Sequence, residues 1–168
     1  KGNPALGMDR GHKADPNANR EWSPAEWADA RRLAPREVCT AMMLARYAGF
    51  RGQTIARLQW KTYQDDPDFG KCFRHTAKKN DEQSYVPAVP LLRNYVDALP
   101  VRHLEFIAVR DDGTPWPSEK LLQATVSHFL RSIEATSAVD PGATMHGLRV
   151  TYAAERKQFG QQIGKFQG

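Results

Sequence analysis

A chain of 168 residues is long enough for one well-packed domain, with at most an additional arm. Hydrophobic residues make up 40% and charged residues 26%, which is ordinary for a soluble globular protein, and no apolar run approaches the roughly 20 residues of a membrane span. The net charge of +5 favours an anionic partner, of which nucleic acid is the commonest. Two cysteines are too few for a disulfide framework, so a reducing cytoplasm is the simpler expectation.

The first twenty residues indicate a linker or an arm, because they are rich in Gly, Pro, Asn and charge and show no hydrophobic period. A helix then starts at a strong signal. Ser23 is a candidate N-cap, Pro24 suits the first helical position, and Glu26 completes a capping box. We expect this helix to end before Pro35, since the residue that precedes a proline avoids helical geometry.

Residues 36–48 are apolar around most of the helical circumference, which predicts a helix in the centre of the domain with Gly49 as its C-cap. Residues 53–60 favour a short helix. Two short strands at 71–77 and 84–89 flank a polar turn, which is typical of a β-hairpin.

Residues 89–99 predict a further helix with an apolar inner side. We expect that side to carry Val89, Leu92, Tyr95, Val96 and Leu99. Residues 106–110 favour a third strand, and Ser118 caps a long helix whose apolar stripe runs from Leu121 to Ile133. A turn then precedes a last helix that begins near His146. The sequence therefore predicts a mainly α fold with a small antiparallel β-sheet (α+β).

Three basic positions carry possible chemistry. Arg51 follows the expected end of the central helix, Lys78 and Lys79 lie in the hairpin turn, and His146 and Arg149 share one helical face because they are three residues apart. Each position also has an ordinary interpretation as a solvated surface charge. The functional alternative for H-x-x-R is a site for an anionic group such as a phosphate.

In this order the three positions resemble the catalytic domain of the tyrosine recombinases, the phage integrase family. The resemblance covers about residues 20–160. Its segments are "AMMLARYAGFRGQTIARLQW", similar to the first arginine motif, "HTAKKNDEQSYVPAVPLLRNYVDAL", similar to the lysine hairpin, and "MHGLRVTYAAE", similar to the H-x-x-R box. It implies the DNA breaking-rejoining fold. We expect residues 1–20 to be a linker from an absent N-terminal core-binding domain, and residues 21–168 to be a catalytic domain that lacks its C-terminal part.

The resemblance implies site-specific DNA recombination through a 3′-phosphotyrosyl intermediate, without metal or other cofactor. Arg51 and Arg149 match the arginines that grip the non-bridging oxygens of the scissile phosphate. His146 matches a general acid/base, and Lys79, with Lys78 as the alternative, matches the lysine that protonates the departing 5′-oxygen. The implied partner of these residues is double-stranded DNA, with a homotetramer on DNA in the complete protein. The implied location is the bacterial cytoplasm, at the nucleoid, for a bacterial or phage-encoded protein.

Two positions depart from the family pattern. Thr54 stands where the family often has an acidic residue, so we expect altered support of the first arginine. The family's nucleophilic tyrosine lies beyond the H-x-x-R helix, and we expect Tyr152 to be a core or supporting residue instead. Two alternative functions stay open: a catalytically inactive, DNA-binding integrase remnant, and a basic helical protein that binds RNA or another protein.

Overall fold

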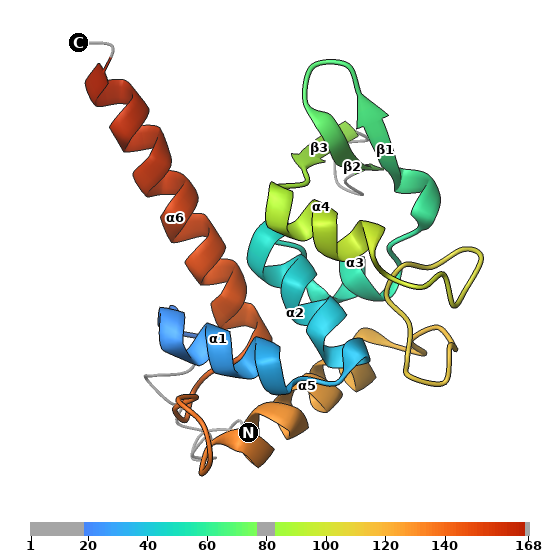
Figure 1. Cartoon of the computed structure of the whole chain (residues 1–168), viewed down its shortest axis with the longest axis vertical. Coiled ribbons are helices and arrows are strands. Elements are labelled where there is room, and N and C mark those ends of the chain that lie inside the picture. Colours follow the sequence, from blue (N-terminus) through green and yellow to red (C-terminus); the bar gives the residue numbers. More distant parts are fainter. Residues whose placement is uncertain (1–18, 77–82, 167–168) are drawn as a thin grey trace, which may run out of the picture.

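Helices predominate in the chain, of which the computed structural model describes residues 19–76 and 83–166 (Figure 1). In order these residues form α1 (Pro24–Leu33), α2 (Arg36–Ala48), α3 (Gly52–Ala56), the 3₁₀ turn η1 (Trp60–Thr62), β1 (Tyr63–Asp66), β2 (Gly70–Thr76), β3 (Gln83–Pro87), α4 (Pro90–Asp97), α5 (Glu119–Ile133) and α6 (Met145–Phe166). The predicted α+β class, mainly helical with a small antiparallel sheet, is confirmed.

Helix α1 begins and ends as its sequence predicts. The Ser23 hydroxyl accepts a hydrogen bond from the Glu26 backbone N–H (3.2 Å), and the Glu26 carboxylate accepts one from the Ser23 N–H (2.8 Å), which is a complete capping box. The rings of Trp22 and Trp27 meet edge to face across this start. The helix ends at Leu33, two residues before the proline.

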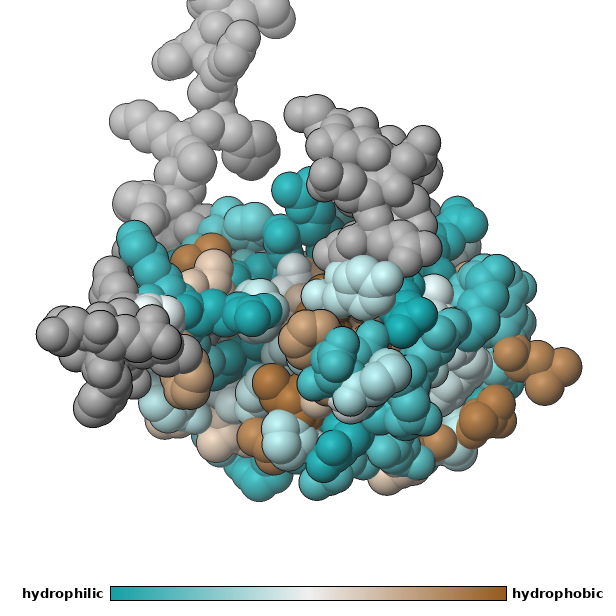
Figure 2. Space-filling model, turned by 90° about the horizontal axis from the view of Figure 1, so that it is seen from above, coloured by the Kyte–Doolittle hydropathy of each residue, from teal (hydrophilic) through white to brown (hydrophobic). Residues whose placement is uncertain are grey.

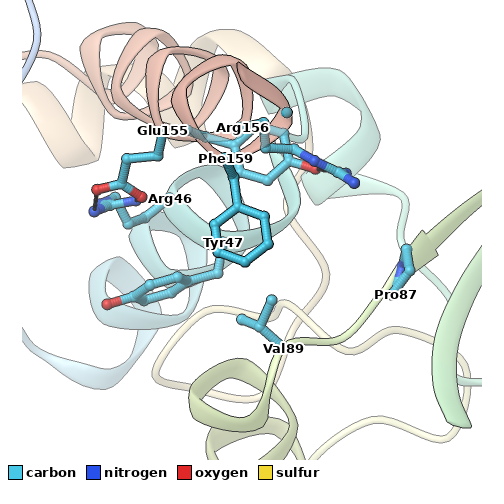
Figure 3. Close-up of a pocket in the computed structure, with 9 residues that line it drawn as sticks. Arg46, Tyr47, Pro87, Val89, Glu155, Arg156 and Phe159 are labelled. Atoms are coloured by element: carbon cyan, nitrogen blue, oxygen red, sulfur yellow. Dashed lines mark hydrogen bonds and ion pairs between the residues drawn. The ribbon is translucent and has the colours of Figure 1, made fainter. Parts of the chain in front are cut away.

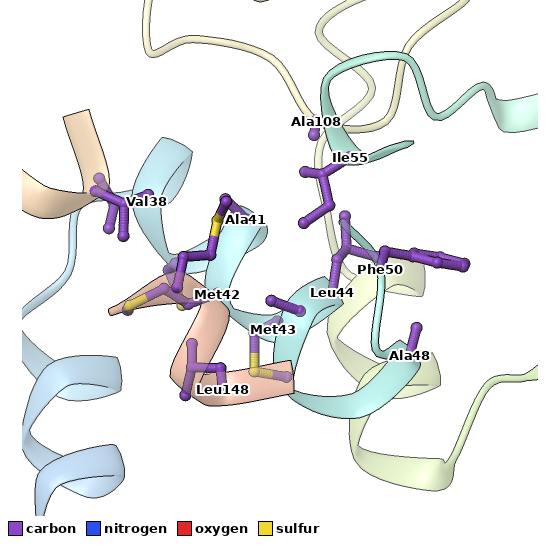
Figure 4. Packing of buried hydrophobic residues seen from close by; sticks show 14 of the residues in the cluster. Val38, Ala41, Met42, Met43, Leu44, Ala48, Phe50, Ile55, Ala108 and Leu148 are labelled. Carbon is purple, nitrogen blue, oxygen red and sulfur yellow. The ribbon is translucent and has the colours of Figure 1, made fainter. Parts of the chain in front are cut away.

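Helix α2 is the centre of the hydrophobic core. Its residues Met42, Met43 and Leu44 are fully buried, and Figure 4 shows Phe50 and Leu148, from outside the helix, packed around it. Helices α3, α4, α5 and α6 all contact α2. Residues 38–45, which make up the two central turns of α2, are all buried, so every face of the helix is covered there.

The sheet consists of β1, β2 and β3 in that order, with both pairs antiparallel. The expectation of a third strand at residues 106–110 is wrong, because the third strand is β1. Residues 106–110 form only single bridges, one of them between Gln59 and Phe106. Their centre, Ile107, is buried in the helical core and its N–H donates to the Leu58 carbonyl (2.9 Å). This segment is apolar because it packs on helices, not because it pairs in a sheet.

The two amphipathic helices bury most of the expected residues. In α4, Leu92 and Val96 are buried, but Val89 is 40% exposed, so its expected place on the inner side is wrong. Val89 is the N-cap, and its backbone (φ −56°, ψ 153°) is not helical, so its side chain does not share the helical face. In α5 the predicted stripe is buried at Leu122, Val126, Leu130 and Ile133, but Leu121, its expected first residue, is 39% exposed.

Helix α6 packs on α2 and α5 through its first half, whereas its second half extends away from the rest of the molecule (Figure 1). Phe159 on that second half is 68% exposed. Viewed from above, the surface is mainly hydrophilic, with hydrophobic residues in small separate patches (Figure 2). None of the helices in the described ranges combines the length and the apolar character needed to cross a bilayer.

The start of α6 is tied to α1 through a buried carboxylate. Glu26 is 3% exposed and accepts hydrogen bonds from Arg20 (2.9 Å), from the Ser23 N–H and from the Asp140 N–H (3.1 Å). Burial by itself would raise the pKa of Glu26. The hydrogen bonds from Arg20, Ser23 and Asp140 outweigh burial and lower that pKa to about 2.

We predict that Glu26 makes the fold acid-sensitive. The folded-state pKa of Glu26 lies below the ordinary 4.5. Its contribution to the free energy of unfolding is therefore complete above about pH 5 and is lost as the pH falls towards 2. The contribution is about 3 kcal/mol. Urea unfolding between pH 6 and pH 3 should show a smaller pH slope for Glu26→Gln than for the unsubstituted chain. Equal slopes would contradict the prediction.

A second prediction concerns Gly49, where α2 ends at φ +66° and a Cβ would lie 2.5 Å from the Tyr152 ring of α6. In Gly49→Ala the alanine would be strained in the left-handed conformation, and its methyl group would clash with the Tyr152 ring. We expect the free energy of unfolding to fall by about 3 kcal/mol. Gly70 has the same φ but open space around it, so Gly70→Ala should cost about 1 kcal/mol. Chemical denaturation of both variants isolates the Tyr152 contact, and equal losses would show that the contact is unimportant.

Candidate functional site

A pocket of about 460 Å³ lies where the start of α6 faces the turn before α3 and one side of α5. Its lining includes three of the predicted site residues, Arg51, His146 and Arg149. The remaining lining residues are Asn19, Gly52, Glu119, Gln123, Ser127, Thr144 and Met145. Positions from both ends of the sequence therefore meet at one concave surface.

Arg51 enters the pocket from the turn between α2 and α3. It is exposed, in extended conformation, and it precedes the first residue of α3. The next residue, Gly52, is buried, and a Cβ there would lie 3.0 Å from Met145 and 3.1 Å from Glu119. The absence of a side chain at Gly52 thus lets the backbone that carries Arg51 approach both α6 and α5.

Arg149 faces Arg51 from the first turns of α6. Its Nε donates a hydrogen bond to the Gly49 carbonyl (2.8 Å), which fixes the guanidinium beside the end of α2. Burial, and then the positive charge of Arg51, lower the pKa of Arg149. Across the ranges 19–74 and 85–160, no carboxylate forms an ion pair with either guanidinium. Two positive groups at one pocket without a paired acid are suited to an anion.

His146 lies in the first turn of α6, exposed and on the same pocket as Arg149. That turn is held by Thr144, whose hydroxyl accepts a hydrogen bond from the Gly147 N–H (3.0 Å) in the manner of an N-cap. The imidazole can therefore donate to, or accept from, a group bound between it and the arginines.

The predicted hairpin is confirmed by its strands, since β2 and β3 pair up to Thr76 and Gln83. Lys78 and Lys79 lie outside the described residues. Their assignment as the catalytic lysine and its alternative, and as DNA contacts, stays a prediction.

Tyr152 does not line this pocket. Its ring lies against Gly49, and its hydroxyl accepts a hydrogen bond from Arg156 (2.7 Å). It contributes instead to a second pocket of about 480 Å³, in which Tyr47, Val89 and Phe159 lie around the cavity (Figure 3). The packing is that of a supporting residue, as the sequence leads us to expect.

Sequence reasoning missed the contribution of α5 to the pocket. Glu119, Gln123 and Ser127 follow one another at intervals of four residues, on the helical side that borders the buried stripe. The Gln123 amide donates to the Glu119 carboxylate (2.7 Å). This polar spacing was the available signal. Asn19 had no comparable signal, because it lies in the segment assigned to the linker.

Among the residues that the structure describes, no group of three or more His, Cys, Asp or Glu side chains could hold a metal ion. The pocket itself is lined by three basic side chains, those of Arg51, His146 and Arg149.

Comparisons with known proteins identify the fold. No protein-family model matches the chain, and no curated protein matches it. Solved structures of lambda integrase do match. The catalytic core has a TM-score of 0.61 at 18% identity, over 80% of this chain and 81% of that one.

Two larger lambda integrase structures are also similar, each at 18% identity. The integrase bound to DNA has a TM-score of 0.61, over 86% of this chain and 52% of its own. The tetramer bound to a Holliday junction has a TM-score of 0.58, over 80% of this chain and 41% of its own. This chain thus spans about half of those longer chains. It has the tyrosine recombinase catalytic-domain fold.

Proposed function

We propose that the chain acts in site-specific DNA recombination or integration, and that its pocket binds the scissile phosphate during strand cleavage and rejoining. The observation that carries the proposal is that Arg51 and Arg149 line one pocket, and that no carboxylate among the described side chains pairs with either. The resemblance to lambda integrase, a protein solved with DNA, supports the same partner.

The proposed chemistry follows from where charge develops. Attack on the phosphorus places negative charge on the non-bridging oxygens, which two guanidinium groups can bind through charge-assisted hydrogen bonds. His146 lines the same pocket as the two arginines, and we assign to it the exchange of a proton with the reacting group. The proton for the departing 5′-oxygen would come from Lys79, or from Lys78. The product of the first step is a 3′-phosphotyrosyl link and a free 5′-hydroxyl.

We assign the nucleophile to no residue of this chain. None of the tyrosines that the structure describes lines the pocket, and the Tyr152 hydroxyl contacts Arg156. We therefore expect the 168 residues by themselves to bind duplex DNA without cleaving it.

In the complete protein we propose a homotetramer on DNA, by analogy with the lambda integrase tetramer, in the bacterial cytoplasm. We further propose that residues 1–20 link this domain to a core-binding domain, and that this link ends at Asn19 and Arg20, which contact the catalytic-domain fold.

The alternative is a DNA-binding integrase remnant without catalysis, which the unassigned nucleophile favours. A nicked suicide duplex, offered to the longest natural form of the protein, separates the two. A covalent protein–DNA adduct that resists denaturation supports the recombinase. Tight binding without an adduct supports the remnant.

We predict that Arg51→Ala and Arg149→Ala each reduce cleavage by the complete protein about 10²- to 10³-fold, the usual cost of losing one donor to a developing oxyanion. Arg149→Lys should also be strongly impaired, because an ammonium cannot reproduce the planar fork of the guanidinium. Single-turnover cleavage measures both effects. Arg57→Ala is the matched control, since Arg57 is exposed at the end of α3 and does not line the pocket. A loss at Arg57 equal to that at Arg51 would refute the assignment.

A further prediction is that DNA binding by the 168-residue chain is weak, non-specific and sensitive to salt. Each phosphate contact contributes about 0.9 to the slope of log K against log salt concentration. Arg51→Ala should therefore lower the slope by about that amount in fluorescence-anisotropy titrations. Binding that does not change as the salt concentration rises severalfold would contradict the prediction.

A further inference from the structure

The segment that precedes α1, residues 19–22, lies across the first turns of α6; we call it the pre-α1 segment. The Trp22 N–H donates to the Thr151 hydroxyl (2.9 Å), and the Trp22 indole N–H donates to the Thr144 carbonyl (3.0 Å). The Thr144 hydroxyl donates in turn to the Asn19 side chain (2.9 Å). Thr144 precedes His146 and Thr151 follows Arg149, so the segment is bonded to the chain on both sides of the H-x-x-R pair.

The closest approach is at Gly147, between His146 and Arg149 in sequence. Gly147 is buried, and a Cβ there would lie 2.5 Å from the Arg20 carbonyl oxygen and 3.0 Å from the Trp22 indole nitrogen. Real Cβ atoms do not approach backbone atoms so closely, so any side chain at this position must push the pre-α1 segment and α6 apart. The helix therefore uses glycine here at a cost in helix propensity.

The pre-α1 segment is itself held in place. Arg20 pairs with the buried Glu26 of α1, and Glu26 also accepts from the Asp140 N–H in the loop before α6. Asn19 adopts a left-handed conformation (φ +63°), which asparagine tolerates better than most residues, and it lines the pocket with Arg51 and Arg149. The segment is thus anchored at α1 and contributes directly to the pocket wall.

Arg149 is held from two sides by these contacts. On one side its Nε bonds to the Gly49 carbonyl, and on the other the pre-α1 segment contacts the helix that carries it. Moving α6 away from the segment would change the position of Arg149 relative to Gly49, and that of His146 relative to Arg51.

We infer that the pre-α1 segment is a positioning element of the pocket: through Gly147 and Thr144 it sets where His146 and Arg149 stand. This inference rests on the proposed function, since the ligand concerned is the same phosphate. The residues of the segment act through α6, apart from Asn19, which also forms part of the wall.

The test compares two Gly→Ala variants of α6 in the 168-residue chain. Both replacements favour an isolated helix. At Gly160 an added methyl group would meet nothing within 4 Å beyond its chain neighbours and the backbone of its own helix, whereas at Gly147 it meets the pre-α1 segment. NMR spectra record the Arg149 Nε–H signal without ligand and then the titration with inorganic phosphate.

We expect Gly147→Ala to shift the Arg149 Nε–H signal and to weaken phosphate binding about tenfold, as for the loss of one hydrogen bond to a charged group. Gly160→Ala should change neither. An unshifted signal, or a shifted signal with unchanged phosphate affinity, would overturn the inference. If the unsubstituted chain does not bind phosphate, the proposed function fails, while the Arg149 signal of Gly147→Ala still decides whether the segment positions this side chain.

A second pair of variants covers the case in which Gly147→Ala does not fold. Thr144→Val removes the hydroxyl that caps α6 and bonds to Asn19, whereas Thr144→Ser keeps it. We expect the valine variant to shift the Arg149 signal and to weaken phosphate binding. The serine variant should keep the signal and the phosphate affinity of the unsubstituted chain. Equal behaviour of the two variants would overturn the inference.

Discussion

The left-handed turn at Gly49 fixes how α2, α3 and α6 meet, and the pocket depends on it. At this residue α2 ends, the Tyr152 ring packs against the bare Cα, and the carbonyl accepts the hydrogen bond from Arg149. Two residues later the extended chain presents Arg51. One backbone conformation therefore determines the end of the central helix, the docking of α6 and the approach of the two arginines.

Bringing two guanidinium groups to one pocket is electrostatically unfavourable, and the lowered pKa of Arg149, caused by burial and by Arg51, reflects it. The core provides the compensating free energy, because the central turns of α2 are fully buried and α6 packs directly on this helix. A bound anion would supply the missing negative charge. Glu119, the carboxylate that lines the pocket, is bonded to Gln123 and forms no ion pair with the arginines.

Segments far apart in sequence supply the remaining walls of the pocket. The pre-α1 segment contributes Asn19, α5 contributes three polar residues, and α6 contributes the H-x-x-R pair. Each of these elements is held by contacts outside the pocket, such as the Arg20–Glu26 pair and the buried stripe of α5. These contacts hold the elements in place and leave the side chains that line the pocket available to a ligand. A pre-organised site requires both.

Features that depend on neighbouring residues could be predicted from the sequence. The capping box of α1, the glycine at the end of α2, the stripe of α5 and the shared face of His146 and Arg149 all follow from helix stereochemistry within a few positions. The α+β class follows from the same patterns, and the order of the basic motifs indicated the recombinase fold.

Which of these local features meet was settled by long-range packing. The fold pairs β1 with β2 and buries Ile107 and Ala108 in the hydrophobic core, although residues 106–110 have the more strand-like composition. It also brings Arg51 to His146 and Arg149, and lays residues 19–22 across Gly147. An apolar pattern predicts that a segment is buried, but it does not predict which segment packs against it. That partner is determined by packing between residues far apart in the chain.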